Sequence, residues 1–274
     1  LAVEMVGAAR YLLLGEGRRG VVAGEDGYLF TDEEFRSPAH LEASMTASVD
    51  QISSIAKTLA DRNIRLIMVP LPMKSDVYHD ELHQPAASAM AKEIYENFRA
   101  KLVERGITSV DTRSVLVSAR NGQQVFLKTD THWTPAGAQV VADAVAAQAL
   151  GEKPDMFEMS KGADQQVEGD LVKYVTGGVF ARFVGLGTET VTPYTVTAKA
   201  DTFQINDLFG DATSIPVALV GTSYSANPKW NFIGALKQEL GSDLLNYAEN
   251  GHGPLVPMLR LLQRGPEETA DLRL

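Results

Sequence analysis

The 274-residue chain has 45% hydrophobic and 22% charged residues, a composition that supports one large α/β domain or two small ones. Its formal net charge of −10 argues against nucleic acid or an anionic membrane surface as the main partner, because both attract basic proteins. The lack of cysteine excludes disulfides, thiolate metal sites and a cysteine nucleophile. The longest apolar run, residues 11–14, is far shorter than the roughly 20 residues that cross a bilayer.

Strands and helices are predicted to alternate along most of the chain. The predicted helices, in chain order, cover residues 41–61, 85–105, 135–150, 227–240 and 254–263. The predicted strands cover residues 64–69, 107–111, 125–128, 215–220 and 244–247. Because several of these strands are continuous apolar runs, they indicate an α/β fold with a doubly wound, mostly parallel sheet. Residues 154–207 break the pattern, and their β-branched residues and glycines predict an irregular, strand-rich insertion within one domain over residues 1–274.

Two polar segments each follow a predicted strand and precede a helix: Asp130-Thr131-His132 and Gly221-Thr222-Ser223-Tyr224-Ser225. In a parallel sheet such segments meet beyond the carboxyl ends of the strands, where helix N-termini present amide donors. Acyl transfer through a covalent intermediate needs a nucleophile, a base and an acid that orients the base. Ser223, His132 and Asp130 supply these three groups, so we predict that they form the catalytic site.

Other interpretations of the same residues stay open. Asp130 and His132 also fit a helix-entry segment, and Ser223 fits a small residue in a turn. The segment after Ser223 lacks the final glycine of Gly-x-Ser-x-Gly, which argues against a standard α/β-hydrolase elbow. A second triad of Ser223, Asp243 and His252 has the α/β-hydrolase chain order, and Ser225 is a rival nucleophile.

Further polar residues are candidates for supporting roles. The developing oxyanion could be bound by the backbone N–H of Ser223 or Tyr224, or by the side chain of Asn246 or Asn227. Lys74 follows a predicted strand end and could hold a substrate or cap a helix.

A metal centre is a weaker interpretation. Asp130 and His132 could bind a metal together with His79 or His252, but the sequence offers no clear third ligand. The glycine-rich residues 15–20 are not followed by the Lys-Ser/Thr of a P-loop.

Five motifs together resemble the SGNH-hydrolase-like domain of the bacterial alginate O-acetyltransferases, the AlgJ/AlgX family, over nearly the whole chain. They are Gly27-Tyr28-Leu29-Phe30, Val69-Pro70-Leu71-Pro72, Asp130-Thr131-His132-Trp133-Thr134, Gly221-Thr222-Ser223-Tyr224-Ser225 and Asn246-Tyr247-Ala248-Glu249-Asn250-Gly251. In that family the catalytic Asp and His precede the Ser, and Asp130, His132 and Ser223 occupy the matching positions.

The resemblance implies a periplasmic O-acetyltransferase that acetylates mannuronate hydroxyls of alginate through an acetyl-serine intermediate. A carbohydrate acetylesterase with the same triad and a noncatalytic subunit of the acetylation complex stay open as alternatives. We expect no cofactor. The resemblance also implies a membrane-embedded acetyl donor such as AlgI, with AlgF and AlgX in the same machinery. The chain begins at Leu1 without a methionine, so we expect any tether to the inner membrane to lie outside it. It ends at Leu274 without the carbohydrate-binding module that AlgX adds, so we expect no tight independent binding of long alginate.

Overall fold

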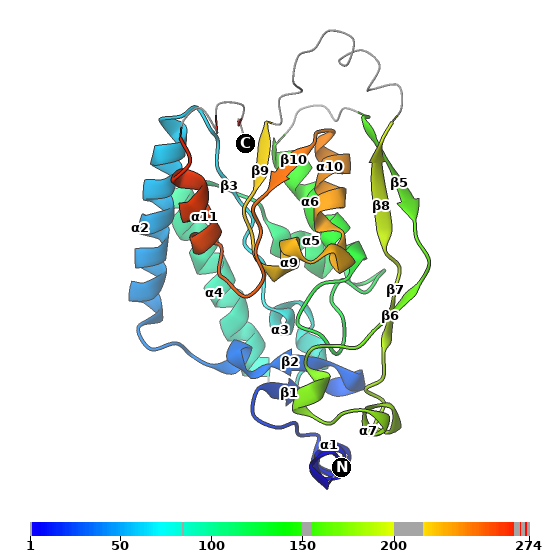
Figure 1. The fold of residues 1–274 in the computed structure, drawn as a ribbon. Helices are drawn as coiled ribbons and strands as arrows, with labels where there is room; N and C mark the ends of the chain where they lie inside the picture. The colour runs from blue at the N-terminus through cyan, green and yellow to red at the C-terminus, as the bar shows by residue number, and fades with distance from the viewer. Residues whose placement is uncertain are drawn as a thin grey trace.

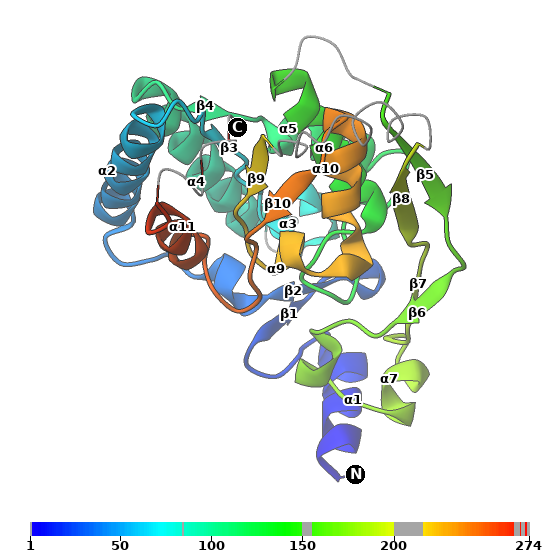
Figure 2. The same cartoon turned by 45° about the horizontal axis from the view of Figure 1, so that its top comes forward.

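The computed structural model describes residues 2–83, 85–149, 155–199, 216–265, 269 and 272. Two parallel strand pairs lie near its centre: β3 (Ile67–Met68) with β4 (Thr108–Ser109), and β9 (Val217–Leu219) with β10 (Leu244–Asn246). Figures 1 and 2 show β3, β9 and β10 between α2, α4 and α11 on one side and α5, α6 and α10 on the other. These helices are α2 (Leu41–Ala60), α4 (Pro85–Glu104), α5 (Thr112–Ala119), α6 (Pro135–Ala149), α10 (Phe232–Leu240) and α11 (Leu255–Leu262).

The parallel pairs agree with the predicted α/β class. Within the described residues, however, every named strand pairs with a single neighbour, giving two-stranded sheets. A continuous doubly wound sheet therefore stays a prediction, as does the single domain over residues 1–274.

The helix predictions for residues 41–61, 85–105 and 254–263 are confirmed to within about two residues by α2, α4 and α11. Helix α6 confirms the prediction at 135–150 up to Ala149, and Leu150 lies outside the described residues. The start at 227 is wrong, because Asn231 adopts a left-handed φ of 53° and α10 begins only after it. The Asn227 side chain instead caps the short helix η5 (Pro228–Trp230) by accepting from the Lys229 N–H.

The predicted strand at 125–128 is also wrong. Only an isolated bridge joins Phe126 to Trp133. Around that bridge, Leu127 donates to the His132 carbonyl and Thr134 donates to the Val125 carbonyl. These bonds close a tight loop on itself, and the Lys128 carbonyl accepts from the Leu29 N–H, but no strand ladder forms.

Antiparallel strands make up the rest of the sheet structure. β1 (Val21–Ala23) pairs with β2 (Leu29–Thr31). In the described part of the predicted insertion, residues 155–199, antiparallel pairs join β5 to β8 and β6 to β7; the remainder of the insertion lies outside the described residues. These strands are β5 (Phe157–Lys161), β6 (Gln165–Val167), β7 (Glu189–Val191) and β8 (Tyr194–Ala198).

The main hydrophobic core gathers large aromatic side chains beneath the two polar segments singled out above. Trp133, Trp230, Phe30 and Phe126 are fully buried in it. Helix α6 packs on both α5 and α10 and closes this core from one side. The two polar segments are thus supported by rigid, close-packed structure.

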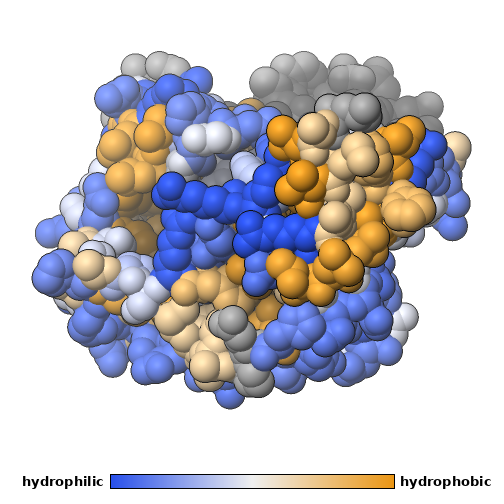
Figure 3. All heavy atoms as spheres, turned by 90° about the horizontal axis from the view of Figure 1, so that it is seen from below, coloured by the Kyte–Doolittle hydropathy of each residue, from blue (hydrophilic) through white to orange (hydrophobic). Residues whose placement is uncertain are grey.

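Apolar side chains are exposed on α1 (Ala2–Leu14) and α7 (Val179–Phe183), in contrast to the buried core. These two helices pack on each other at one end of the molecule (Figure 1). Their outward apolar side chains include Leu13, 81% exposed, and Phe183, 78% exposed. Seen from this end, Figure 3 shows hydrophobic residues gathered beside strongly hydrophilic ones. Among the described residues, no helix has the length and hydropathy needed to cross a membrane.

Candidate active site

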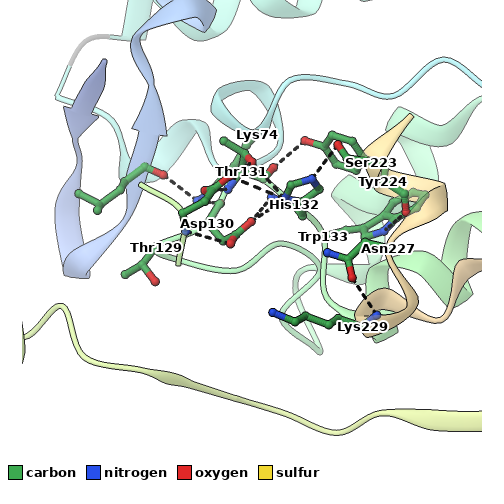
Figure 4. Close-up of polar contacts among 12 residues, drawn as sticks. Lys74, Thr129, Asp130, Thr131, His132, Trp133, Ser223, Tyr224, Asn227 and Lys229 are labelled. Carbon is green, nitrogen blue, oxygen red and sulfur yellow. Dashed lines mark hydrogen bonds and ion pairs between the residues drawn. The ribbon is translucent and has the colours of Figure 1, made fainter. Parts of the chain in front are cut away.

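The structure brings Ser223, His132 and Asp130 together in one hydrogen-bonded chain (Figure 4). Asp130 and His132 lie in the tight loop before α6, and Ser223 is the first residue of α9 (Ser223–Ala226), which follows β9. His132 Nδ1 is 2.7 Å from Asp130 Oδ1, and His132 Nε2 is 2.9 Å from Ser223 Oγ. A carboxylate can only accept, so the Nδ1–H donates to Asp130 and leaves Nε2 free to accept the Ser223 hydroxyl proton.

Asp130 is held in its charged form. Burial alone would raise the pKa of its carboxyl, but hydrogen bonds from the His132 ring, the His132 backbone N–H and the Asp170 backbone N–H outweigh it. The net effect is a pKa below the ordinary value of an aspartate. At neutral pH this carboxylate can therefore fix the tautomer of His132 and stabilise its cation.

Aromatic rings fix the orientation of the imidazole. The His132 ring lies 4.8 Å from the Tyr224 ring and 5.6 Å from the Trp230 ring, with the second pair stacked. Tyr224 also links the two halves of the site, because its hydroxyl donates to the Thr131 carbonyl at 2.6 Å and its own carbonyl accepts from Trp133 Nε1 at 3.1 Å. Burial raises the pKa of Tyr224, so its hydroxyl remains a donor.

Two acidic side chains from the insertion bind the backbone of the loop that carries Asp130 and His132. Asp170 accepts from the Thr131 N–H at 2.8 Å and from the Thr131 hydroxyl at 2.6 Å. Glu189, at the start of β7, accepts from the N–H groups of Lys128 and Thr129, each at 2.8 Å. The loop is thus held by side chains distant in sequence.

Sequence reasoning missed Asp170 and Glu189. A signal for Asp170 is the preceding Gly169, because a Cβ at that position would lie 2.1 Å from the Thr129 carbonyl oxygen. Only glycine permits this backbone approach. A glycine beside an acidic residue in an irregular segment could therefore have indicated close contact with another part of the chain.

The remaining predicted site residues lie in different surroundings. The Lys74 ammonium is buried beneath the loop and donates to three backbone carbonyls. Asn246 ends β10, and its side-chain oxygen accepts from the Ala248 N–H. The backbone N–H groups of Ser223 and Tyr224 begin α9, where amide groups lack partners within the helix.

The structure does not assemble the alternative triad. Asp243 forms an ion pair with Lys237 at 2.6 Å and accepts from the Leu244 N–H. The imidazole beside Ser223 is that of His132, whereas His252 is exposed. The rival nucleophile, Ser225, is buried.

Asp130, His132 and Asp170 also meet the loosest requirement for a metal site, since one ligand atom from each lies within 4.8 Å of the others. Their atoms are already engaged with each other and with the loop: Asp130 with the His132 ring, and Asp170 with Thr131. This donor set fits a proton relay, in which every group has a hydrogen-bond partner.

Asp130 and His132 precede Ser223 in the chain, which is the order expected from the family that the five motifs resemble. The family model for the SGNH hydrolase-like domain of the acetyltransferase AlgX matches residues 21–274. The probable alginate O-acetylase AlgJ of Azotobacter vinelandii is 40% identical over 96% of this chain and 69% of its own length.

Solved structures agree with this match. The O-acetyltransferase domain of Pseudomonas putida AlgJ superposes with a TM-score of 0.79 at 36% identity, covering 92% of this chain and 88% of that domain. Pseudomonas aeruginosa AlgX gives a TM-score of 0.63 at 27% identity, covering 84% of this chain and 55% of that protein. The chain therefore belongs to the AlgJ/AlgX family and has its SGNH-hydrolase-like fold.

Proposed function

We propose that the protein is an O-acetyltransferase that acetylates mannuronate hydroxyls of alginate through an acetyl-serine intermediate at Ser223. The observation that carries the proposal is the hydrogen-bonded chain from Asp130 through His132 to Ser223. The reaction class and the polymer come from relatives in the family, which are named as probable alginate O-acetylases.

The first half-reaction transfers acetyl to the enzyme. His132 Nε2 takes the proton of Ser223 as Oγ attacks the acetyl carbonyl of an ester donor, and Asp130 stabilises the imidazolium that forms. The bond between the carbonyl carbon and the donor oxygen then breaks, and His132 returns the proton to that oxygen. The products are acetyl-Ser223 and the deacylated donor alcohol.

The second half-reaction transfers acetyl to the sugar. A mannuronate hydroxyl gives its proton to His132 and attacks the acetyl-serine carbonyl, and the bond to Ser223 Oγ breaks as that oxygen regains the proton. In both steps negative charge develops on the carbonyl oxygen. The backbone N–H groups of Ser223 and Tyr224 are the proposed donors to it, with Asn246 as a proposed side-chain donor.

An exposed lysine in η5 supports a uronate substrate. Lys229 lies in η5, its side chain is exposed, and the next residue, Trp230, stacks its ring on His132. In a chain of net charge −10, an exposed cation at the binding site offsets part of the repulsion of a polyanion. We assign Lys229 to binding a mannuronate carboxylate.

The cellular setting is proposed from the resemblance to the family. It comprises a periplasmic location with association to the inner membrane through a segment outside this chain, acetyl supply by AlgI, and joint action with AlgF and AlgX.

The test is intact-mass analysis of the wild type and Ser223→Ala after incubation with a chromogenic acetyl ester, with and without mannuronate oligomers. We expect a Ser223-dependent gain of one acetyl group, followed by its transfer to the oligomer. Acetate release without sugar acetylation would replace the transferase with an esterase. Full transferase activity in Ser223→Ala would refute the mechanism.

A further inference from the structure

Lys74 is a charged side chain in the interior of the protein, directly beneath the loop that carries Asp130 and His132. It begins α3 (Lys74–Val77) and is 2% exposed. Its ammonium donates to the carbonyl oxygens of Leu29 at 2.7 Å, Lys128 at 2.8 Å and Asp130 at 3.0 Å. An ammonium has three N–H groups, so all of them are used on the backbone.

The three carbonyls connect the loop to the hydrophobic core. Leu29 belongs to β2 and is fully buried, and its own N–H donates to the Lys128 carbonyl at 2.8 Å. Lys74 therefore joins a rigid strand to the residue two positions before Asp130 and to Asp130 itself. The peptide that carries the Asp130 side chain is fixed from below by this cation.

The ammonium is buried beside two aromatic rings. Its nitrogen lies 5.6 Å from the centre of the Tyr28 ring and 5.3 Å from that of Phe30. Among the described residues, no ion pair within 4.0 Å involves Lys74, although the carboxylates of Glu34, Glu189, Asp130 and Asp170 act on it through space. A buried charge without a close ion-pair partner is costly, and the three hydrogen bonds to backbone carbonyls compensate for part of that cost.

We propose that Lys74 is a positioning residue, whose ammonium holds the Asp130 loop so that Asp130, His132 and Ser223 remain in line for acetyl transfer. This inference rests on the proposed function and differs from both roles considered for Lys74 in the sequence, which were holding a substrate and capping a helix. Small displacements of a catalytic group reduce rates strongly, by about 10²-fold for an error near 1 Å.

A pH effect follows from the same geometry. Burial lowers the pKa of Lys74 to about 8, against the opposing effect of Glu34, Glu189, Asp130 and Asp170. Above that pH the Lys74 amine is neutral and has two N–H groups in place of three. It can then no longer donate to all three backbone carbonyls. The nearby phenol of Tyr28 does not titrate in this range, because burial raises its pKa.

The experiment compares Lys74→Met with Asp76→Asn. Asp76 lies on the same short helix, is equally buried, and its carboxylate forms hydrogen bonds and an ion pair with Arg113, at 2.6 Å. Both substitutions remove one buried charge from the same short helix, so Asp76→Asn controls for the loss of a buried charge there. The readouts are kcat, KM and their pH dependence with a soluble acetyl ester, below the unfolding temperature of each variant.

We expect Lys74→Met to lower kcat by about 10²-fold with little change in KM. We also expect the kcat of the wild type to fall as the pH rises through about 8, and this alkaline decline should be absent in Lys74→Met. Asp76→Asn should retain that decline and most of kcat. If Lys74→Met does not fold, Lys74→Gln keeps N–H donors without charge and should also lack the alkaline decline.

Two results would overturn the inference: an unchanged pH profile in the Lys74 variants, or a fall in kcat no larger than that of Asp76→Asn. Ser223→Ala in the same assay separates this failure from that of the proposed function. If Ser223→Ala loses activity but the pH profile of kcat in the Lys74 variants matches that of the wild type, only the role of Lys74 is rejected.

Discussion

Replacing Asp130 with asparagine removes the charge that orients His132 while preserving the size of the side chain. Asp130 accepts from His132 through Oδ1 and from the Asp170 backbone N–H through Oδ2. An amide has one oxygen, so one of these donors must face an NH2 group, or His132 must adopt the wrong tautomer. By the behaviour of serine–histidine–aspartate sites, the expected loss in kcat is about 10⁴-fold, or roughly 5.5 kcal/mol.

The same substitution should alter stability and its dependence on pH. A buried donor left without an acceptor costs about 1–3 kcal/mol in the free energy of unfolding. The pKa of Asp130 is lowered in the folded protein, so its contribution to stability is present above the ordinary carboxyl pKa of about 4 and is lost as the pH falls through the lower folded value. Asp130→Asn should lack this part of the acid transition.

The assay is a pair of measurements on the wild type and Asp130→Asn. Denaturant unfolding between pH 2 and 7, a range chosen around the carboxyl pKa of about 4, gives the stability difference. Acetyl-ester turnover with mannuronate oligomers gives kcat. A folded Asp130→Asn that retained activity within about tenfold of the wild type would refute the orienting role assigned to Asp130.

Two further substitutions test the supports of the site. Gly169→Ala would place a Cβ 2.1 Å from the Thr129 carbonyl oxygen, so we expect a loss of about 1–3 kcal/mol in unfolding free energy and lower kcat, whereas Gly253→Ala, with open space around it, should change neither. Lys229→Gln should raise KM for mannuronate oligomers up to about fivefold at low salt, because an exposed ion pair contributes about 0–1 kcal/mol. KM for a neutral acetyl ester should stay unchanged, and an equal rise for both substrates would exclude carboxylate binding by Lys229.

Long helices and their ends were predictable because local chemistry decides them. Thr134 accepts from the Gly137 N–H and Pro135 opens α6, as the sequence indicates. Residues 125–128 were not predictable in this way, because an apolar run that enters a tight loop has the same composition as a buried strand. Contacts with the rest of the chain decide whether such a run becomes a strand or a loop.

The meeting of Ser223, His132 and Asp130 was predicted from their residue types and from two polar segments that each precede a helix, although the strand predicted before Asp130 does not form. The contacts that hold the Asp130 loop in place could not be predicted. Lys74 was singled out, but its burial is a property of packing, and Asp170 and Glu189 come from an irregular segment without periodicity. Side chains that bind a backbone far away in sequence leave no local pattern.

The loop from Lys128 to His132 also bears on protein engineering. Its peptide groups are bound by an ammonium from α3, by one carboxylate before η4 (Val172–Tyr174) and by another at β7. A five-residue graft containing the aspartate and histidine would therefore arrive in a new scaffold without its anchors. Transplanting this chemistry requires moving charged partners from three separate parts of the chain together with the loop.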